Sequence, residues 1–190
     1  MARIGIFGGT FNPIHLGHLL LAETARERLA LDRVLFIPTR LPPHKRVRGL
    51  LPGPARLQLI ELAIRDHPAF VASDIELQRP GPSYSIDTVR LLRQRLPGAA
   101  LFLLLGEDML AARWVAWGEL SRLCTVVAAH RPGAPHPAPV RGIRWLAMPQ
   151  VDIASTDIRK RLAAGRSIRY LVPPLVERHI LQHRLYMAAS

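Results

Sequence analysis

Short apolar runs alternate along the chain with longer stretches in which apolar residues recur every three or four positions. The runs predict strands buried on both faces, and the periodic stretches predict helices with one buried side. The predicted strands cover 3–7, 34–37, 70–73, 101–105, 126–129 and 144–146, and the predicted helices cover 16–30, 55–66, 85–95, 156–164 and a last segment ending at 183. Their alternation predicts an α/β fold, a single Rossmann-like, doubly wound parallel sheet with helices on both faces. The last helices form a small C-terminal helical segment, and we expect residues 1–190 to be one domain.

In such a sheet, ligands bind beyond the carboxyl ends of the strands. Residues 8–18, which follow the first predicted strand, read GGTFNPIHLGH. Glycines let the main chain approach an anion, and the N–H groups of a first helical turn favour negative charge. His15 and His18 are three residues apart, so both project from one side of that turn and each can donate a hydrogen bond to a phosphate oxygen. Gly17 weakens the helix start, and close approach by a ligand is one reason for a glycine there.

A phosphate site accounts for the two histidines better than a metal site or a plain helix start does. A metal-binding pair on a helix favours a spacing of four residues, and HExxH is absent. Helix formation alone accounts for one histidine at a helix start better than for two behind a Gly-Gly turn. The common phosphate loop GxxxxGK(S/T) is absent, and GxGxxG does not occur at this turn. The sequence therefore predicts a phosphate site of another type.

The stretch from Thr10 to His18 fits the pattern (S/T)xxxxHxGH, which resembles the signature of the nucleotidyltransferase superfamily. The longer form GGTFNPIHxGH resembles the bacterial nicotinate-nucleotide adenylyltransferase family. This resemblance implies that ATP and nicotinate mononucleotide react to give deamido-NAD and pyrophosphate. It also implies that His15 and His18 are catalytic and contact the triphosphate. The other implied ATP contacts in this stretch are Gly8, Gly9, Thr10 and Phe11.

Two segments resemble the mononucleotide side of the same family. Residues 42–45 read PPHK, and residues 82–88 read PSYSIDT. Lys45 carries a point charge that suits phosphate, and the resemblance assigns it to catalysis near the attacking phosphate; read alone, this segment is a solvated basic loop. The N–H groups at a helix start suit a carboxylate, which in the family is that of nicotinate, and the Ser85 side chain is expected to cap the same helix. The implied mononucleotide contacts here are His44, Lys45, Tyr84, Ser85 and Thr88.

The residues after the apolar run 101–105 also match the family. Gly106 allows a ligand to approach the end of the strand, and Asp108 can accept hydrogen bonds from ribose hydroxyls. Trp114 and Trp117, expected in a loop, offer flat surfaces on which a heteroaromatic ring can stack. Trp114 comes early after Asp108 for the family's spacing, so either tryptophan can be the stacking residue, and both can be core residues. The resemblance assigns ATP to Gly106 and Asp108, and the mononucleotide to Trp114, Val115 and Trp117.

Two more segments complete the resemblance. Residues 130–133 read HRPG where the family has RRPG, and residues 154–159 read ASTDIR where it has SSTx(I/L)R. The second segment begins a helix with Ser155 as its expected N-cap, and Arg159 lies one turn further on the same side. It predicts a second phosphate site that contains an arginine fork. The implied ATP contacts are Arg131, Ser155, Thr156, Ile158 and Arg159.

A net charge of +12 and a pI of about 11.4 raise the possibility of nucleic-acid binding. Only Lys45 and Lys160 are lysines, and the arginines are scattered over the predicted helix faces, so we interpret the charge as a background that favours phosphorylated substrates. No apolar stretch is long enough to span a membrane, and the N-terminus does not resemble a signal peptide. Cys124 is the single cysteine. We therefore expect a cytoplasmic enzyme that binds neither nucleic acid nor membrane.

We expect Mg²⁺ to enter with ATP, held by phosphates and water, and we predict no metal site made by the protein. Two alternatives remain open. One is a sister adenylyltransferase that acts on nicotinamide mononucleotide or phosphopantetheine, of which the PPHK and SYS segments and the paired tryptophans disfavour the second. The other is a basic nucleic-acid-binding protein on the same fold. The sequence leaves the oligomeric state undefined.

Overall fold

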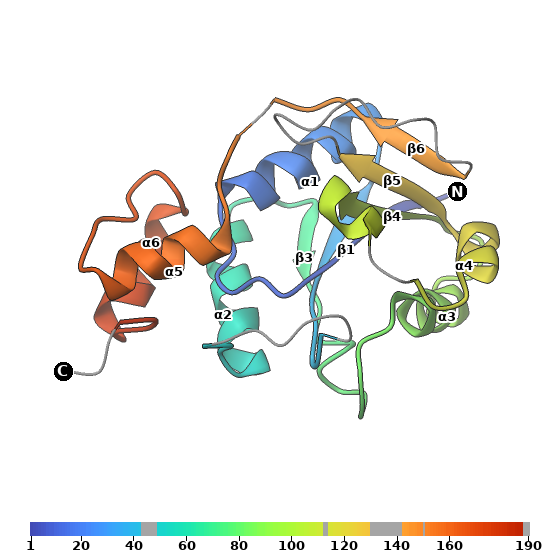
Figure 1. The fold of residues 1–190 in the computed structure, drawn as a ribbon. Coiled ribbons are helices and arrows are strands. Elements are labelled where there is room, and N and C mark those ends of the chain that lie inside the picture. Colours follow the sequence, from blue (N-terminus) through green and yellow to red (C-terminus); the bar gives the residue numbers. More distant parts are fainter. Residues whose placement is uncertain (43–48, 112–113, 130–141, 150, 188–190) are drawn as a thin grey trace.

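The fold is built on a six-stranded parallel sheet (Figure 1) in a computed structural model that describes residues 1–42, 49–111, 114–129, 142–149 and 151–187. The strands lie in the order β3-β2-β1-β4-β5-β6. Their bounds are β1 Arg3–Gly9, β2 Arg33–Pro38, β3 Phe70–Ala72, β4 Ala100–Gly106, β5 Thr125–Ala129 and β6 Ile143–Leu146. All six predicted strands are present, and the predicted doubly wound α/β fold is confirmed.

The central strands are apolar on both sides because each face of the sheet carries its own hydrophobic core. In β4, Leu103 and its alternate neighbours belong to one core, whereas Phe102 and Leu104 belong to the other. Strand β1 divides in the same way, with Ile6 on the Leu103 side and Phe7 on the Phe102 side. Burial on both faces of a parallel sheet explains why the sequence shows continuous apolar runs rather than strict alternation with polar residues.

The helices divide between these two cores. Helices α1 (Leu16–Arg28), α2 (Gly53–Ile64), α5 (Ser155–Ala163) and α6 (Pro174–Gln182) contribute to the core that contains Phe102. Helices α3 (Ser85–Arg95) and α4 (Trp117–Leu123) contribute to the core that contains Leu103. Figure 1 shows α5 and α6 together at one end of the molecule, opposite α3 and α4. They form the small C-terminal helical segment that the sequence predicts.

Two short elements between β4 and β5 were not predicted. A 3₁₀ helix, η1, covers Glu107–Ala111, and α4 begins at Trp117 after Ala116, which has a φ of 53°. The expectation that both tryptophans lie in a loop is therefore wrong for Trp117. Only Leu120 of α4 is buried, and so short a helix with one buried side chain gives no clear periodic signal. Within the described part of the chain, no helix is long and apolar enough to cross a membrane.

The strand order reverses beside β1. The chain passes from β1 through β2 to β3 on one side, and then returns to β4 on the other side of β1. The segment after β1 leads to α1 on one face, whereas the segment after β4 leads to η1 and α4, and α4 covers the other face. Loops that diverge in this way leave a crevice at the carboxyl edge, where such sheets bind ligands.

The buried thiol of Cys124 gives a direct test of this packing. Burial raises the pKa of Cys124 to about 11, and its Sγ donates to Leu120 O at 3.3 Å. At pH 8 the thiolate fraction is therefore about one part in a thousand, and access of reagent is blocked as well. We expect the native protein to resist Ellman's reagent at pH 8 while the urea-unfolded chain releases one equivalent of thionitrobenzoate. Equal rates for the two forms would contradict the assigned packing.

Candidate active site

The loop after β1 is shaped by an aromatic side chain that turns inward. Phe11 has a φ of 45°, and its buried ring packs edge-on against Phe7 with centroids 5.4 Å apart. A Cβ at Gly9 would lie 3.0 Å from Phe11 Cζ, so glycine makes room for this ring. The Phe11 ring also meets the imidazole of His18 edge-on at 5.0 Å. Phe11 therefore supports His18 with its side chain, and its predicted contact with ATP stays a prediction.

The two predicted histidines form a stacked pair at the start of α1. His15 is the residue before the helix and is 4% exposed, and His18 is the third helical residue. Their ring centroids are 3.6 Å apart. The main-chain N–H of His15 donates to His18 Nδ1 at 3.2 Å, so in the neutral ring the proton belongs on Nε2. This bond fixes the orientation of the His18 ring and makes Nε2 its donor.

The structure gives a specific reason for Gly17. A Cβ at this position would lie 3.2 Å from both Cε1 and Nδ1 of His15. The His15 ring lies over Gly17, so a contact within the protein already explains the glycine, and the expected approach of a ligand stays a prediction. The glycine acts on the site through the position of this imidazole.

Helix α5 is joined to the same loop by two hydrogen bonds. Ser155 Oγ donates to Pro13 O at 2.9 Å, and Arg159 Nη1 donates to Asn12 O at 2.8 Å. The N-cap of α5 is Ala154, so the prediction that Ser155 caps this helix is wrong, because its hydroxyl serves the loop instead. Arg159 Nη2 also reaches Thr156 Oγ1 at 3.5 Å. These bonds bring the two predicted phosphate segments, 8–18 and 154–159, together.

A buried arginine of α2 stabilises the loop after β1. Arg56 of α2 is 1% exposed, and it donates from Nε to Leu51 O at 2.9 Å, from Nη1 to Thr10 O at 2.8 Å and from Nη2 to Thr39 O at 2.7 Å. Burial lowers the pKa of Arg56, but a guanidinium stays protonated at neutral pH. One cation therefore connects the segments that follow β1 and β2 with the start of α2.

Asn12 completes this connection. It is 1% exposed, its Nδ2 donates to Gly49 O at 3.0 Å, and its Oδ1 accepts from Leu51 N–H at 3.1 Å. Its Oδ1 also accepts from Tyr186 Oη at 2.8 Å. We call Asn12, Arg56, Arg159 and Tyr186 the Asn12 cluster. Both ends of the Asn12 amide are thus engaged in fixing the loop.

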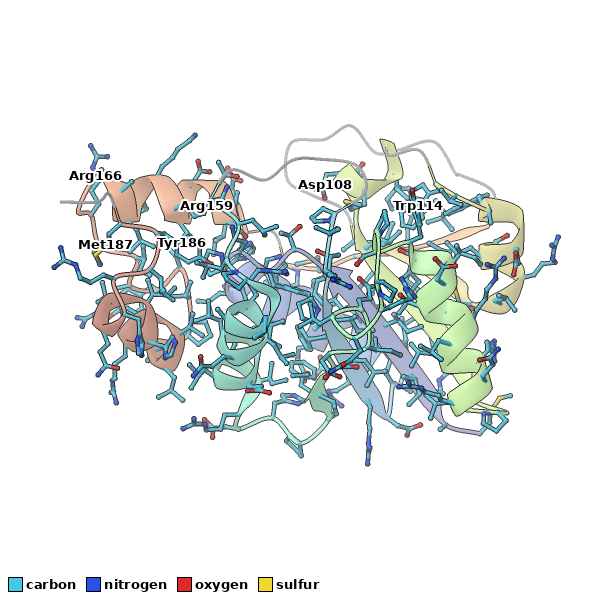
Figure 2. All side chains as sticks on the ribbon, turned by 90° about the horizontal axis from the view of Figure 1, so that it is seen from below. Asp108, Trp114, Arg159, Arg166, Tyr186 and Met187 are labelled. Carbon is cyan, nitrogen blue, oxygen red and sulfur yellow. The ribbon has the colours of Figure 1, made fainter. Side chains whose placement is uncertain are left out.

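The end of β4 carries the second group of predicted residues. A Cβ at Gly106 would lie 2.6 Å from Asp108 Oδ1, so the glycine makes room for this carboxylate. Trp114 Nε1 donates to Met109 O at 3.0 Å, and the Trp114 and Trp117 rings meet edge-on at 5.7 Å. Figure 2 shows Asp108 between Arg159 and Trp114 along one edge of the molecule. Both tryptophans pack partly against the core, and Val115 is exposed.

The start of α3 differs from expectation in its cap. The helix begins at Ser85 with Tyr84 as its N-cap residue, and no side chain caps it, so the predicted cap by Ser85 is wrong. Asp87 N–H donates to Tyr84 O at 3.1 Å, whereas the N–H groups of Ser85 and Ile86 come before the first intrahelical acceptor, as the predicted carboxylate site requires. Thr88 is buried, and its hydroxyl donates to Glu76 Oε1 at 2.7 Å. Burial raises the pKa of Glu76, an effect that hydrogen bonds from Thr88 and Ser83 partly offset.

The remaining predicted contacts divide into two groups. The side chain of Ile158 is buried in the core that contains Phe102, and that of Thr88 is held by Glu76, so neither is exposed toward a ligand. His44, Lys45 and Arg131 lie outside the described residues. Their roles stay predictions.

Comparisons with known proteins agree with this arrangement. The Cytidylyltransferase-like family model matches residues 6–161. A protein of Thermus thermophilus named as a probable nicotinate-nucleotide adenylyltransferase is 46% identical over 186 residues, covering 97% of this chain and 99% of its own. A protein of the same name from Geobacter sulfurreducens is 41% identical over 211 residues, covering 97% of this chain and 98% of its own.

The chain belongs to the nicotinate-nucleotide adenylyltransferase family. It is therefore a nucleotidyltransferase, and the resemblance carried by residues 8–18 is confirmed. The structure of Plasmodium falciparum nicotinic acid mononucleotide adenylyltransferase complexed with NaAD has the same fold, with a TM-score of 0.81 at 16% identity over 98% of each chain.

Three residues that hold the candidate site together were not predicted from the sequence: Asn12, Arg56 and Tyr186. One signal was available for Arg56. It precedes Leu59 and Ile60 by three and four residues, so it lies on the apolar side of α2, where an arginine needs buried acceptors. Asn12 lies within residues 8–18, but no local pattern links it to Tyr186.

Substitution of Gly17 by alanine tests the contact with His15. A methyl group 3.2 Å from the imidazole displaces the ring by a few tenths of an ångström, whereas alanine is favourable in a helix. We expect G17A to keep its unfolding free energy and to lose about three- to tenfold in kcat. G118A is the matched control, because Gly118 is also the second residue of its helix and has no atom within 4 Å of the added Cβ. Equal activity in G17A and G118A would contradict the role given to Gly17.

Proposed function

We propose that the protein transfers the adenylyl group of ATP to nicotinate mononucleotide, giving deamido-NAD and pyrophosphate, and that residues 1–190 act as one nucleotidyltransferase domain. The observation that carries this proposal is the hydrogen-bonded union of the loop after β1 with the start of α5. It brings the segment that carries a histidine pair together with the helix that carries an arginine. Relatives that are more than 40% identical over nearly the whole chain and carry the name of this activity support it.

The triphosphate side consists of donors whose directions are fixed in advance. His18 presents Nε2–H because Nδ1 is already occupied, and the stacked His15 ring restricts its movement. Arg159 adds a planar cation held at Asn12 O. Donors that do not reorganise during the reaction stabilise the charge that develops on a leaving group. We assign the β- and γ-phosphates of ATP to this side, with Thr10, Ser155 and Thr156 beside them.

The reaction needs positioning more than acid–base chemistry. An oxygen of the mononucleotide phosphate forms a bond to the α-phosphorus of ATP, and the bond from that phosphorus to the α,β-bridging oxygen breaks. The attacking phosphate is already ionised at neutral pH, so no general base is required. The protein holds two anions in line and stabilises the pyrophosphate that leaves. Lys45 is the predicted cation for the attacking phosphate.

Mg²⁺ belongs to this proposal as a companion of the nucleotide. Among the residues that the structure describes, no group of three or more His, Cys, Asp or Glu side chains could hold a metal ion. Phosphate oxygens and water are suitable ligands for Mg²⁺. A cytoplasmic location and the lack of nucleic-acid binding stay predictions from the sequence.

The pyridine ring is assigned to the surface between Trp114 and the start of α3. The Trp114 ring is fixed by its bond to Met109 O, which favours it over Trp117 as the stacking platform. The N–H groups at Ser85 carry the positive end of the helix dipole and suit a carboxylate. This assignment gives the expected preference for nicotinate over nicotinamide a physical cause.

The assay that tests the function is pyrophosphate release from ATP with nicotinate mononucleotide, nicotinamide mononucleotide or phosphopantetheine. We expect release with the first. Release only with one of the others would move the protein to a sister activity. Salt-dependent binding to random duplex without ATP turnover would favour the nucleic-acid alternative.

Substitution of His18 tests the triphosphate assignment. Loss of one fixed donor to developing charge lowers the rate by about 10²- to 10³-fold, and we expect H18A to show this loss in kcat while it stays folded. H183A is the control, because His183 is an exposed histidine at the end of α6. If H18A keeps more than about a third of the wild-type kcat, the assigned role is wrong.

Comparison of the acid and amide substrates tests the pyridine site. An amide turns its own N–H donors toward the N–H groups at Ser85, so we expect kcat/KM to favour nicotinate mononucleotide by about 100-fold or more. W114A should weaken both substrates and leave their ratio nearly unchanged, because a ring face does not distinguish the two substituents. Comparable kcat/KM values in the wild-type enzyme would refute the assignment to Ser85.

A further inference from the structure

The described end of the chain returns to the loop after β1. Tyr186 Oη donates to Asn12 Oδ1 at 2.8 Å across a separation of 174 residues. The segment after α6 is itself fixed, since Leu185 N–H donates to Ile180 O at 3.0 Å and both Leu185 and Tyr186 pack against the core. Figure 2 shows Tyr186 and Met187 at the same end of the molecule as Arg159. The C-terminal segment therefore touches the proposed nucleotide site through one hydroxyl group.

The backbone of this segment is held in an unfavourable conformation. Arg184 has a φ of 51° and Tyr186 a φ of 62°, values that non-glycine residues adopt only when their surroundings stabilise them. Two such residues within three positions turn the Tyr186 ring back onto the molecule. Its hydroxyl then lies within the electrostatic influence of both Arg56 and Arg159. Strained backbone of this kind clusters at active sites and ligand clamps.

Asn12 connects the Tyr186 hydroxyl to Arg159 by hydrogen bonds. Asn12 Oδ1 accepts from Tyr186 and from Leu51 N–H, while the main-chain oxygen of Asn12 accepts from Arg159 Nη1. Without the hydroxyl, Asn12 keeps its bonds to Gly49 and Leu51, so the loop stays folded. The orientation of its peptide, and with it the acceptor of Arg159, is then less restricted.

We propose that Tyr186 is a positioning residue for the ATP side of the site: its hydroxyl fixes Asn12, and Asn12 fixes the guanidinium of Arg159. The inference rests on the proposed function, because the site that it orders is the proposed triphosphate site. It gives the C-terminal segment after α6 a role in nucleotide binding, although no residue of that segment has been placed against a substrate.

The variant Tyr186→Phe keeps the ring and removes only the hydroxyl. One intramolecular hydrogen bond corresponds to about a three- to tenfold change in an equilibrium, so we expect Y186F to lose about that factor in kcat/KM for ATP. The KM for nicotinate mononucleotide should not change, because the start of α3 and Trp114 have no described bond to the Asn12 cluster. A purely structural role would lower the free energy of unfolding, and the loss of activity would then be the same toward both substrates.

Two controls make the test specific. Y170F removes a hydroxyl from a tyrosine that is 82% exposed, and it should match the wild type in both KM values. In an N12A background, adding Y186F should cause no further loss toward ATP, because the residue through which Tyr186 acts is absent. Each variant is checked for folding by urea unfolding before its kinetics are compared.

The positioning role of Tyr186 and the proposed function are contradicted by different results. Wild-type ATP parameters in Y186F, equal losses toward both substrates, or a full additional loss on N12A would overturn the positioning role. Absence of pyrophosphate release from the wild-type protein would overturn the proposed function instead. In that case the Kd for ATP alone, measured by calorimetry for the wild type, Y186F and Y170F, still tests whether the hydroxyl orders the nucleotide site.

Discussion

The buried guanidinium of Arg56 is the constraint on which the candidate site depends. A cation removed from water is tolerated only when its donors are satisfied, and loss of its partners is costly. Its three described bonds reach the carbonyl of Thr10 in the loop after β1, and those of Thr39 and Leu51 at the two ends of the connection between β2 and α2. Movement of any one of these segments would leave a buried donor without its acceptor. The loop after β1 is therefore held in one conformation before a substrate arrives.

This constraint has an electrostatic consequence. The described hydrogen bonds of Arg56 all go to neutral carbonyls rather than to a carboxylate, so the positive charge acts on its surroundings instead of being paired. Arg159, which donates to Asn12 O, adds a second cation. Fixed positive charge and helix N-termini at the carboxyl edge of the sheet favour phosphates over neutral ligands. The site therefore supplies rigid geometry and charge, which are the two requirements of in-line transfer between phosphates.

The sequence predicts well those features that depend on local patterns. Continuous apolar runs locate the strands, because a parallel sheet buried on both faces leaves no polar positions within them. Residues 8–18 predict a phosphate site, because a glycine turn followed by two histidines suits an anion better than a metal ion or a plain helix start. The pattern at residues 154–159 is also local, and it correctly predicts a helix start there, although Ser155 donates to Pro13 O rather than capping the helix.

Features that arise from contacts between distant segments were not predictable in this way. The Tyr186–Asn12 bond joins residues that no periodicity connects, and the contacts of Arg56 appear only when the loop after β1 meets the loop between β2 and α2. Gly17 shows the same limit. The glycine is visible in the sequence, but its cause is the position of the His15 ring, which depends on the packing of the whole loop. Helix α4 was missed because a helix with one buried residue carries almost no hydrophobic signal.

A crystal structure of the protein with a non-hydrolysable ATP analogue tests the central claim, that the loop held by Arg56 and Asn12 is a preformed triphosphate site. The account predicts the β- and γ-phosphates within about 3.2 Å of donors on His18 and Arg159, with the bonds of Arg56 to its three carbonyls unchanged. A triphosphate bound elsewhere would contradict the claim. So would a loop 10–14 that refolds around the nucleotide, because a site that must rearrange is not preformed.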